Sequence, residues 1–213
     1  MIFDGLASMA VRPRGRPRHY DPEHVMRQVL QTFWRQGYAD TSVDELCEAA
    51  GLNKASLYAG FGDKAQLYRL ALGAYLTQAG QAMSSALFEP GVALGPSLHR
   101  LLAHTAEAYR AGRGCFMVST AAMVAWQDEA VREAMNQALA GQSRLLARRF
   151  RQARAEAELA CAVSDEVLAG LVAATLHSMS LRARAGMPEA ALLQWAQAEI
   201  DGLLVLANAQ RSA

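Results

Sequence analysis

Apolar residues recur along this chain three and four residues apart, the spacing that places side chains on one face of an α-helix. Runs of β-branched residues are few and alanine is abundant, so the sequence predicts no strand. Helices are predicted over residues 22–36, 54–61, 97–109, 115–126 and 128–159, and further helices are predicted to begin at residues 42, 63, 165 and 188. The pattern therefore predicts an all-α fold.

The first predicted helix has a clear start and a clear stop. Asp21 is a helix N-cap residue, and Pro22 suits the first helical position. Glu23 places a negative charge in the first turn, where it complements the helix dipole. Gly37 follows the last apolar pair and ends the helix.

Two short helices follow, joined by a tight turn. Ser42 and Glu45 have the spacing of a capping box, which opens the first of them. Gly51 supplies the turn, and Asn53 caps the second, from Lys54 to about Phe61. Two short helices joined in this way predict a helix-turn-helix, whose second helix can enter the major groove of DNA.

The later segments alternate in the same way between helix and loop. Asp63, with Gln66 three positions later, caps a longer helix. The proline and glycine residues of segment 88–97 predict a loop. Segment 115–126, "CFMVSTAAMVAW", is almost wholly apolar, so we expect a helix that is buried on most sides.

Composition excludes several classes of protein. The 213 residues have a formal net charge of +1, so attraction to nucleic acid must come from local charge placement. No apolar run approaches the length of a membrane span, and the N-terminus lacks the basic start of a secretory signal. Three scattered cysteines form neither a disulfide framework nor a zinc cluster. We therefore expect a cytoplasmic protein with no membrane partner, translated from either Met1 or Met9.

Local positive charge is concentrated in "RPRGRPR", residues 12–18. This pattern is that of an AT-hook, in which proline keeps the chain extended and glycine lets the backbone approach the minor groove. Arg14, Arg16 and Arg18 would follow the negative potential of an A·T-rich groove. The alternative is a basic tail without sequence specificity.

The whole chain resembles the TetR family of one-component transcriptional regulators, most specifically over residues 21–72. The matching features are Thr41-Ser42, Ala50-Gly51-Leu52, Ser56-Leu57-Tyr58, Phe61 and Lys64. The resemblance implies about nine helices, with a three-helix DNA-binding domain and a larger ligand-binding and dimerisation domain. It also implies a homodimer that binds double-stranded DNA and a small-molecule effector, and it implies no cofactor.

These features divide the chain into three predicted parts. We expect a basic arm over residues 1–20, the helix-turn-helix domain over 21–66, and the ligand-binding and dimerisation domain over 67–213.

The predicted DNA contacts lie at two helix N-termini and on the second short helix. Hydroxyls at a helix start can bind a phosphate, and the front half of the second helix can reach base edges. By resemblance, Tyr58 and Lys64 contact phosphates, whereas Lys54 and Ser56 contact bases. The full predicted set is Arg14, Arg16, Arg18, Thr41, Ser42, Lys54, Ala55, Ser56, Tyr58 and Lys64. Ala59-Gly60 departs from the family pattern, because many members carry an aromatic and a polar residue there.

The second half of the chain offers candidates for effector binding and dimerisation. Ligand-binding candidates are His104, Cys115, Met117, Met123, Trp126, His177 and Met179, with ordinary core packing as the alternative for each. By resemblance, the last two helices pair with their mates in a dimer, through Leu168, Leu171, Val172, Leu192, Trp195, Ile200 and Leu203. The alternative for these residues is internal core. Pairing of two subunits would let them read a pseudo-palindromic site.

The function predicted is a repressor that a lipophilic or aromatic effector releases from DNA. The segment that begins at Gly114-Cys115 resembles a branch of the family in which some members sense electrophiles or oxidants through cysteine, so a Cys115 sensor is an alternative. A DNA-architectural protein without effector is a more distant one. The sequence contains no nucleophile–base pair, metal cluster or phosphate loop, so we expect no enzyme.

Overall fold

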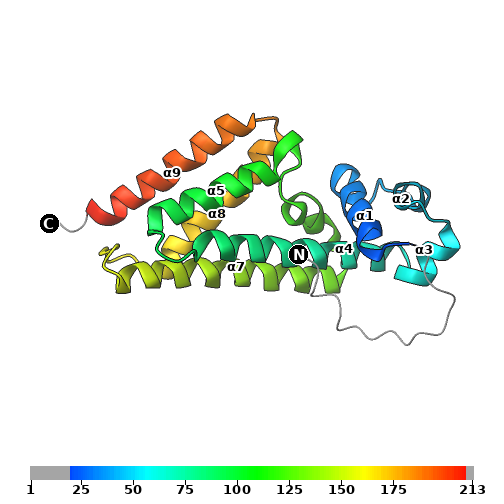
Figure 1. Ribbon diagram of the computed structural model, residues 1–213, viewed down its shortest axis with the longest axis horizontal. Helices are drawn as coiled ribbons and strands as arrows, with labels where there is room; N and C mark the ends of the chain where they lie inside the picture. The colour runs from blue at the N-terminus through cyan, green and yellow to red at the C-terminus, as the bar shows by residue number, and fades with distance from the viewer. Residues whose placement is uncertain (1–19, 210–213) are drawn as a thin grey trace. The chain divides into compact units, whose positions relative to one another are not determined.

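A computed structural model describes residues 20–209, and every element of secondary structure in that range is helical (Figure 1). The predicted all-α class is confirmed, with nine α-helices in the described range. The chain divides into two compact units, the first ending at Gln78 and the second beginning at Ala79. This boundary falls inside helix α4 (Lys64–Leu87).

The first unit contains α1 (Pro22–Gln36), α2 (Val43–Ala50), α3 (Lys54–Phe61) and the first part of α4. The predicted caps are in place. The Asp21 carboxylate accepts from the backbone N–H of Glu23 at 2.9 Å. Gly37, with φ of 84°, closes the helix by donating to the Phe33 carbonyl at 2.8 Å. The sequence pattern therefore predicted both ends of α1.

The core of the first unit is built around aromatic rings. Phe33 of α1 and Tyr68 of α4 are fully buried, and their rings meet edge to face with centroids 5.2 Å apart. Tyr38, in the loop after α1, packs against Tyr68 with centroids 5.1 Å apart. Leu46 of α2 and Leu57 of α3 are also fully buried. Neither short helix is long enough to be stable alone, so each depends on the packing of its inward leucine against the rest of the domain.

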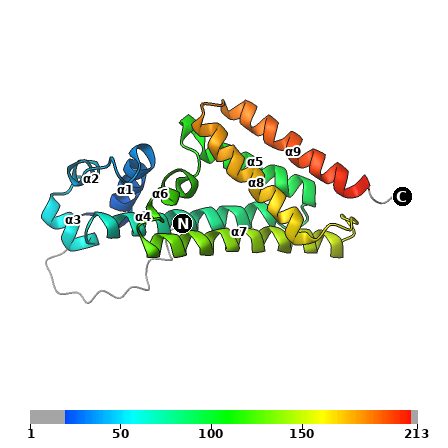
Figure 2. The same ribbon diagram turned by 180° about the vertical axis from the view of Figure 1, so that it is seen from behind.

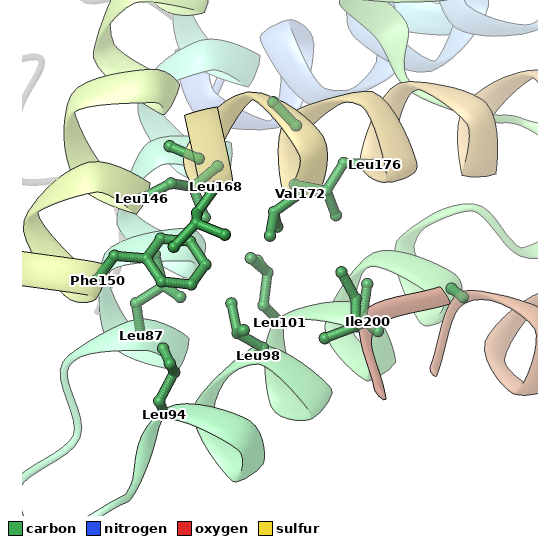
Figure 3. Packing of buried hydrophobic residues seen from close by; sticks show 14 of the residues in the cluster. Leu87, Leu94, Leu98, Leu101, Leu146, Phe150, Leu168, Val172, Leu176 and Ile200 are labelled. Carbon is green, nitrogen blue, oxygen red and sulfur yellow. The ribbon is translucent and has the colours of Figure 1, made fainter. Parts of the chain in front are cut away.

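The second unit contains α5 (Leu94–Ala108), α7 (Glu129–Ala155), α8 (Asp165–Arg184) and α9 (Glu189–Ala209), with the rest of α4. Figures 1 and 2 show α5 and α8 lying between α7 and α9. Figure 3 shows the core that they enclose, where Leu98 and Leu101 of α5 point toward Leu168 and Val172 of α8. This bundle is the larger helical domain that the sequence predicted.

Helix α5 begins three residues earlier than predicted, at Leu94, so the loop before it is shorter. Pro96 lies in the first turn, where its missing N–H costs no intrahelical hydrogen bond. The backbone N–H of Leu94 donates to the carboxylate of Glu158 at 2.5 Å. A buried arginine, Arg149 of α7, donates to the hydroxyl of Ser97 at 3.2 Å and lies 3.5 Å from the same carboxylate. These distant side chains fix the start of α5.

Helix α7 ends at Ala155, about four residues before the predicted end near Leu159. Ala157 adopts the left-handed conformation, with φ of 58°. The N–H of Glu158 then donates to the Ala153 carbonyl at 2.8 Å, which is the hydrogen bond that normally follows a C-terminal glycine. Alanine gives no sequence sign of such a stop, which is why the predicted helix was too long.

The apolar segment after residue 114 is also less regular than predicted. It forms a π-helical turn, η3 (Met117–Ala121), followed by the one-turn helix α6 (Ala122–Val124). A 3-10 turn, η2 (Arg110–Gly112), precedes it. Phe116 is fully buried, but Met123 is 80% exposed and Trp126 is 87% exposed. The expectation of a helix buried on most sides is therefore wrong at these two positions and at Ala122, which is also exposed.

Candidate DNA-binding surface and effector region

Helices α2 and α3 form the predicted helix-turn-helix, and local hydrogen bonds set its geometry. The N–H of Glu45 donates to the Ser42 hydroxyl at 3.2 Å, and the N–H of Ser42 donates to the Glu45 carboxylate at 2.7 Å. This is the predicted capping box. Gly51 ends α2 in the left-handed conformation, with φ of 64°, and the Asn53 side chain accepts from Ser56 N–H at 2.8 Å to open α3. Only Leu52 separates the two cap residues.

One face of α3 is open to solvent. Lys54, Ala55, Tyr58 and Ala59 are exposed, whereas Leu57 on the opposite face is fully buried. The Lys54 ammonium lies 5.8 Å from the centre of the Tyr58 ring, so charge and aromatic surface are adjacent. The buried leucine holds the helix while the exposed face is free to meet a ligand. This is the arrangement that a recognition helix requires.

Ser56, one of the predicted contacts, and Gly60 are turned away from that face. Ser56 is half-buried, and its backbone N–H already bonds to Asn53. Gly60, four residues later, lies on the same side of the helix and is also half-buried. Of the two small residues that depart from the family pattern, only Ala59 is therefore part of the exposed face.

The predicted phosphate site at the start of α2 differs from expectation. The Thr41 side chain is buried, and its hydroxyl donates to the Gly37 carbonyl at 2.6 Å. The Ser42 hydroxyl is exposed but donates to the Glu45 carboxylate at 2.7 Å. Both hydroxyls thus have internal partners, so this placement does not support the predicted contact between Thr41 and a phosphate. For Ser42, a phosphate would have to share the hydroxyl with a carboxylate.

The Glu45 carboxylate is itself held in the charged form. Hydrogen bonds from the backbone and hydroxyl of Ser42 lower its pKa most, and the Gln36 amide and the Lys64 charge lower it further. The amide of Gln36 donates to this carboxylate at 3.0 Å. The negative charge therefore stabilises the N-terminus of α2 from within the protein.

Lys64, the first residue of α4, lies against the loop between α1 and α2. Its ammonium is 4.6 Å from the centre of the Tyr38 ring and 3.5 Å from the Ala39 carbonyl. These contacts hold a positive charge at the beginning of the helix. Arg14, Arg16 and Arg18, the other predicted charges, lie outside the described residues.

In the second unit, Cys115 is buried where the segment after η2 meets α8. Its backbone N–H donates to the Ser180 hydroxyl at 2.8 Å. Gly114, with φ of 62°, allows this approach, because an added Cβ would come within 2.8 Å of the Ser180 carbonyl oxygen. Tyr109 shares a side-chain hydrogen bond with Cys115, and burial, followed by the charge of a Cys115 thiolate, raises the pKa of Tyr109 well above its ordinary value. Cysteine, tyrosine and serine thus meet at one place.

The other predicted ligand residues do not form one cluster. Met117 and Met179 are buried, whereas His104 is exposed, as are Met123 and Trp126. His177 of α8 is half-buried, with a ring nitrogen 3.1 Å from the Gln142 side-chain oxygen, and burial lowers its pKa. The exposed residues are therefore separated from an interior set of Cys115, Met117, His177 and Met179.

The predicted dimer residues divide in the same way. Leu168, Val172, Leu192 and Ile200 are almost fully buried within the chain, so they are internal core, the alternative reading of their pattern. Trp195 and Leu203 are half-buried. Leu171 is 48% exposed, and further exposed apolar residues on α8 and α9 are Val167, Leu181, Val205 and Leu206. The sequence showed which helices carry excess apolar surface, but it could not tell inward from outward stripes.

Sequence reasoning missed Tyr20, Tyr109 and Ser180. Tyr20 packs its ring on Phe61 of α3, with centroids 5.9 Å apart. Tyr109 and Ser180 surround Cys115 through contacts that join distant parts of the chain. Of these three, only Tyr20 could have been recognised from the sequence, because it is an aromatic residue between the arginine segment and the N-cap of α1.

Within residues 20–209, no helix has the length and hydropathy needed to cross a membrane. In the same range, no group of three or more histidine, cysteine, aspartate or glutamate side chains is placed to hold a metal ion.

Comparison with known families gives two matches. Residues 28–71 match the bacterial regulatory proteins of the tetR family, and residues 97–198 match the tetracyclin repressor-like C-terminal domain. The first match spans the helix-turn-helix, and the second spans most of the helical bundle.

Two of the relatives extend over most of the chain, and a third extends over about half of it. The HTH-type transcriptional repressor ComR of Escherichia coli (strain K12) is 28% identical over 188 residues, which cover 86% of this chain and 89% of ComR. The HTH-type transcriptional repressor BdcR of the same strain is 32% identical over 104 residues, covering 49% of this chain and 52% of BdcR. A cysteine mutant of the TetR family transcriptional regulator CifR, complexed with 26-base-pair double-strand operator DNA, is 31% identical with a TM-score of 0.78, covering 87% of this chain and 98% of that chain.

Proposed function

Because this chain belongs to the TetR family of transcriptional regulators, we propose that it is a repressor that binds double-stranded operator DNA through α2 and α3. The family makes it a DNA-binding regulator and not an enzyme, as the sequence predicted. Repression is proposed because ComR and BdcR are repressors, and operator binding because CifR is complexed with its operator. A repressor of this kind acts in the cytoplasm, where bacterial DNA is.

The exposed face of α3 carries this proposal. Lys54, Ala55 and Tyr58 are presented together on a helix that Leu57 anchors from behind. A helix of this kind enters the major groove, where lysine can bond to guanine acceptors and alanine can contact the thymine methyl group. Lys64 adds a charge for a phosphate, whereas Ser56 is half-buried on the flank of α3.

The arginine segment adds a second contact with DNA. Arg14, Arg16 and Arg18 are proposed to follow an A·T-rich minor groove beside the site that α3 reads. Each arginine that neutralises a phosphate releases counterions, so the contribution of this segment falls as salt rises. Replacement of all three by alanine should weaken binding and flatten its salt dependence.

The protein is proposed to act as a homodimer. Leu171 and Leu181 expose apolar surface on α8, and Val205 and Leu206 do so on α9. Pairing of α8 and α9 with their mates would cover these side chains, together with Trp195 and Leu203 at the edges. Two copies of α3 related by a two-fold axis would then read an inverted repeat.

An effector is proposed to bind in the second unit and to release the DNA. Tyr109 and Ser180 contact Cys115, and the same unit also contains the buried Met117 and Met179 and the half-buried His177. This mixture suits a lipophilic or aromatic molecule that carries a polar group. Such a molecule shifts the population only if it prefers the DNA-free arrangement by several kcal/mol.

Oxidation or alkylation of Cys115 is the second candidate for the release step. The observation that favours it is the side-chain contact between Cys115 and Tyr109. Cys115→Ser distinguishes the two triggers. If the serine variant is still released from DNA by an oxidant or electrophile, a Cys115 sensor is excluded.

The recognition role of α3 is tested with Lys54→Ala, with Arg144→Ala as control. Both substitutions remove one positive charge from an exposed site, but Arg144 lies on α7 in the second unit. Lys54→Ala should weaken binding about 10- to 100-fold and relax base preference at one position of each half-site. The control should bind as the wild type does. Equal affinity of both variants for every sequence would exclude recognition through this face and favour an architectural DNA-binding protein.

A further inference from the structure

Tyr38, in the loop between α1 and α2, has a ring that is held in place by the core of the first unit. Its centroid lies 6.1 Å from that of Phe33, with the two rings stacked at 25°, and 5.1 Å from that of Tyr68, at 70°. Phe33 and Tyr68 are fully buried, whereas Tyr38 is half-buried. The core therefore fixes the position of this ring and leaves part of its surface open.

The Lys64 ammonium lies over this ring. It is 4.6 Å from the ring centre, within the range at which an aromatic face attracts a cation. It also lies 3.5 Å from the carbonyl of Ala39, the residue directly after Tyr38. Only Gly62 and Asp63 separate Lys64 from the end of α3. The loop before α2 thus holds a positive charge next to the end of the proposed recognition helix.

Most of the hydrogen-bonding capacity of Lys64 is left for a ligand. An ammonium has three N–H donors, and among the described residues only the Ala39 carbonyl lies within hydrogen-bonding distance of it. Its charge lowers the pKa of Glu45, but that carboxylate accepts hydrogen bonds from Ser42 and Gln36. The ring therefore holds the ammonium without using the donors that a phosphate needs.

We propose that Tyr38 is a positioning residue for DNA binding, whose ring holds the Lys64 ammonium in place before DNA arrives. This inference rests on the proposed contact between Lys64 and a phosphate. Tyr38 itself need not touch DNA, because it acts through Lys64. A core position alone requires only a large apolar side chain at residue 38, whereas this role requires an aromatic ring.

The benefit of the ring is a lower cost of ordering Lys64 on DNA. A free lysine side chain loses much rotational freedom when its ammonium is held at an interface. Immobilising one such side chain lowers affinity about two- to tenfold. The ring restrains the side chain in the free protein, so most of this loss is avoided. A dimer would make the contact twice, so losing the ring should weaken binding to a complete operator about 4- to 100-fold.

Tyr38→Leu is the direct perturbation, and Tyr38→Phe is the matched control. Leucine fills space in the core but has no aromatic face, whereas phenylalanine keeps the ring and loses only the hydroxyl. Loss of the ring contacts with Phe33 and Tyr68 should lower the thermal midpoint of the leucine variant. Binding is therefore measured well below the midpoint, at a temperature where circular dichroism shows each variant folded.

NMR of the free protein tests the contact without DNA. Lys54 and Lys64 are the two lysines of the chain, so a lysine-selective isotope label gives two sets of side-chain signals. Protons over an aromatic ring shift upfield, and Lys64 lies closer to its ring than Lys54 does to Tyr58, at 4.6 Å against 5.8 Å. The methylene protons beside the Lys64 ammonium should be shifted further upfield in the wild type and in Tyr38→Phe, but not in Tyr38→Leu. Absence of this shift in the wild type would overturn the proposal.

The DNA measurement is the dissociation constant of the full chain for a selected operator at several salt concentrations. Lys64→Met, which keeps an apolar stem and removes the charge, should weaken binding and lower the slope of log affinity against log salt by about 2, one phosphate for each half-site. Tyr38→Leu should weaken binding by the amount given above but keep nearly the wild-type slope, because the charge is still present. Tyr38→Phe should bind as the wild type does.

Combining the two substitutions separates positioning from domain stability. In the Lys64→Met background, Tyr38→Leu should have little further effect on affinity, since the ring then has no charge to hold. An equal loss in both backgrounds, or unchanged binding by Tyr38→Leu alone, would show that Tyr38 does not act through Lys64. If Lys64→Met changes neither affinity nor slope, the phosphate contact fails and the inference with it. Recognition by α3 is tested separately by Lys54→Ala, so it can stand when this inference falls.

Discussion

Leu171 of α8 gives the sharpest test of the proposed dimer, through Leu171→Asp. The leucine side chain is 48% exposed in the single chain. Full burial of a leucine is worth about 2 kcal/mol, so covering the exposed half contributes about 1 kcal/mol per subunit. A two-fold interface buries two copies, which gives about 2 kcal/mol per dimer.

The aspartate adds a second cost. It would place a carboxylate in each half of a covered apolar surface, at about 1 to 3 kcal/mol for each polar group left without a partner. The total is about 4 to 8 kcal/mol. Since about 1.4 kcal/mol is a factor of ten, the dimer dissociation constant should rise at least about 10³-fold.

Sedimentation equilibrium of the full chain measures this constant directly. Met123→Asp is the control, because Met123 is 80% exposed but lies on α6, outside the proposed interface. Leu171→Asp should be monomeric at concentrations where the wild type and the control are dimers. Its helical circular dichroism should be unchanged, and it should lose affinity for a two-half-site operator. Dimers of equal stability in all three proteins would refute the assignment of the interface to this face of α8.

Three further predictions concern the fold. Ser42→Ala removes the capping box, so it should lower the free energy of unfolding by about 1 kcal/mol in chemical denaturation. The control Ser84→Ala, a substitution within α4, should lower it by less. Equal losses in the two variants would contradict the capping role. Gly114→Ala should cost on the order of 2 kcal/mol, because a Cβ would overlap Ser180 at a left-handed φ, whereas Gly141→Ala should be neutral or stabilising in the same assay. Burial lowers the pKa of His177, so its contribution to folding stability should be complete above the unfolded pKa of about 6.5 and should decline as pH falls toward the folded value. His177→Gln should therefore reduce the drop in thermal midpoint between about pH 7.5 and pH 5.5. An unchanged drop would assign the pH dependence to other groups.

The helix-turn-helix could be predicted from the sequence because its geometry is set by neighbours in the chain. Asp21, Ser42 and Asn53 each bond to a backbone N–H two or three residues later, so the side chain and its target are read together. Gly51 completes the turn through its own φ. Interactions of this range are visible in residue order alone.

Contacts between distant residues could not be predicted in the same way. The start of α5 depends on Glu158 and Arg149, which lie more than fifty positions later in the chain. Helix α7 stops because Ala157, two residues after its last residue, adopts a left-handed conformation that an alanine does not indicate in the sequence. Thr41 resembles a phosphate-binding residue in sequence but is buried against the Gly37 carbonyl. Only the start of α5 depends on distant partners; the other two features depend on local conformations and hydrogen bonds that the residue types do not indicate.

The apolar stripes of α8 and α9 show the same limit for the interface. Periodicity identified both helices, but Leu168 and Leu171 are three residues apart, and only the second is exposed. A stripe wide enough to serve both an internal core and a partner looks continuous in the sequence. The packing of α5 and α7 against α8 decides which positions remain for a second subunit.

The account as a whole depends on sequence-specific reading of DNA by two copies of α3. Repeated selection of bound DNA from a random pool, followed by sequencing of the bound molecules, measures this most directly. The account predicts that one inverted repeat is enriched, with its half-sites centred about one or more helical turns apart and A·T-rich flanks beside them. Enrichment of no common sequence, or of a single half-site without its inverted partner, would contradict it.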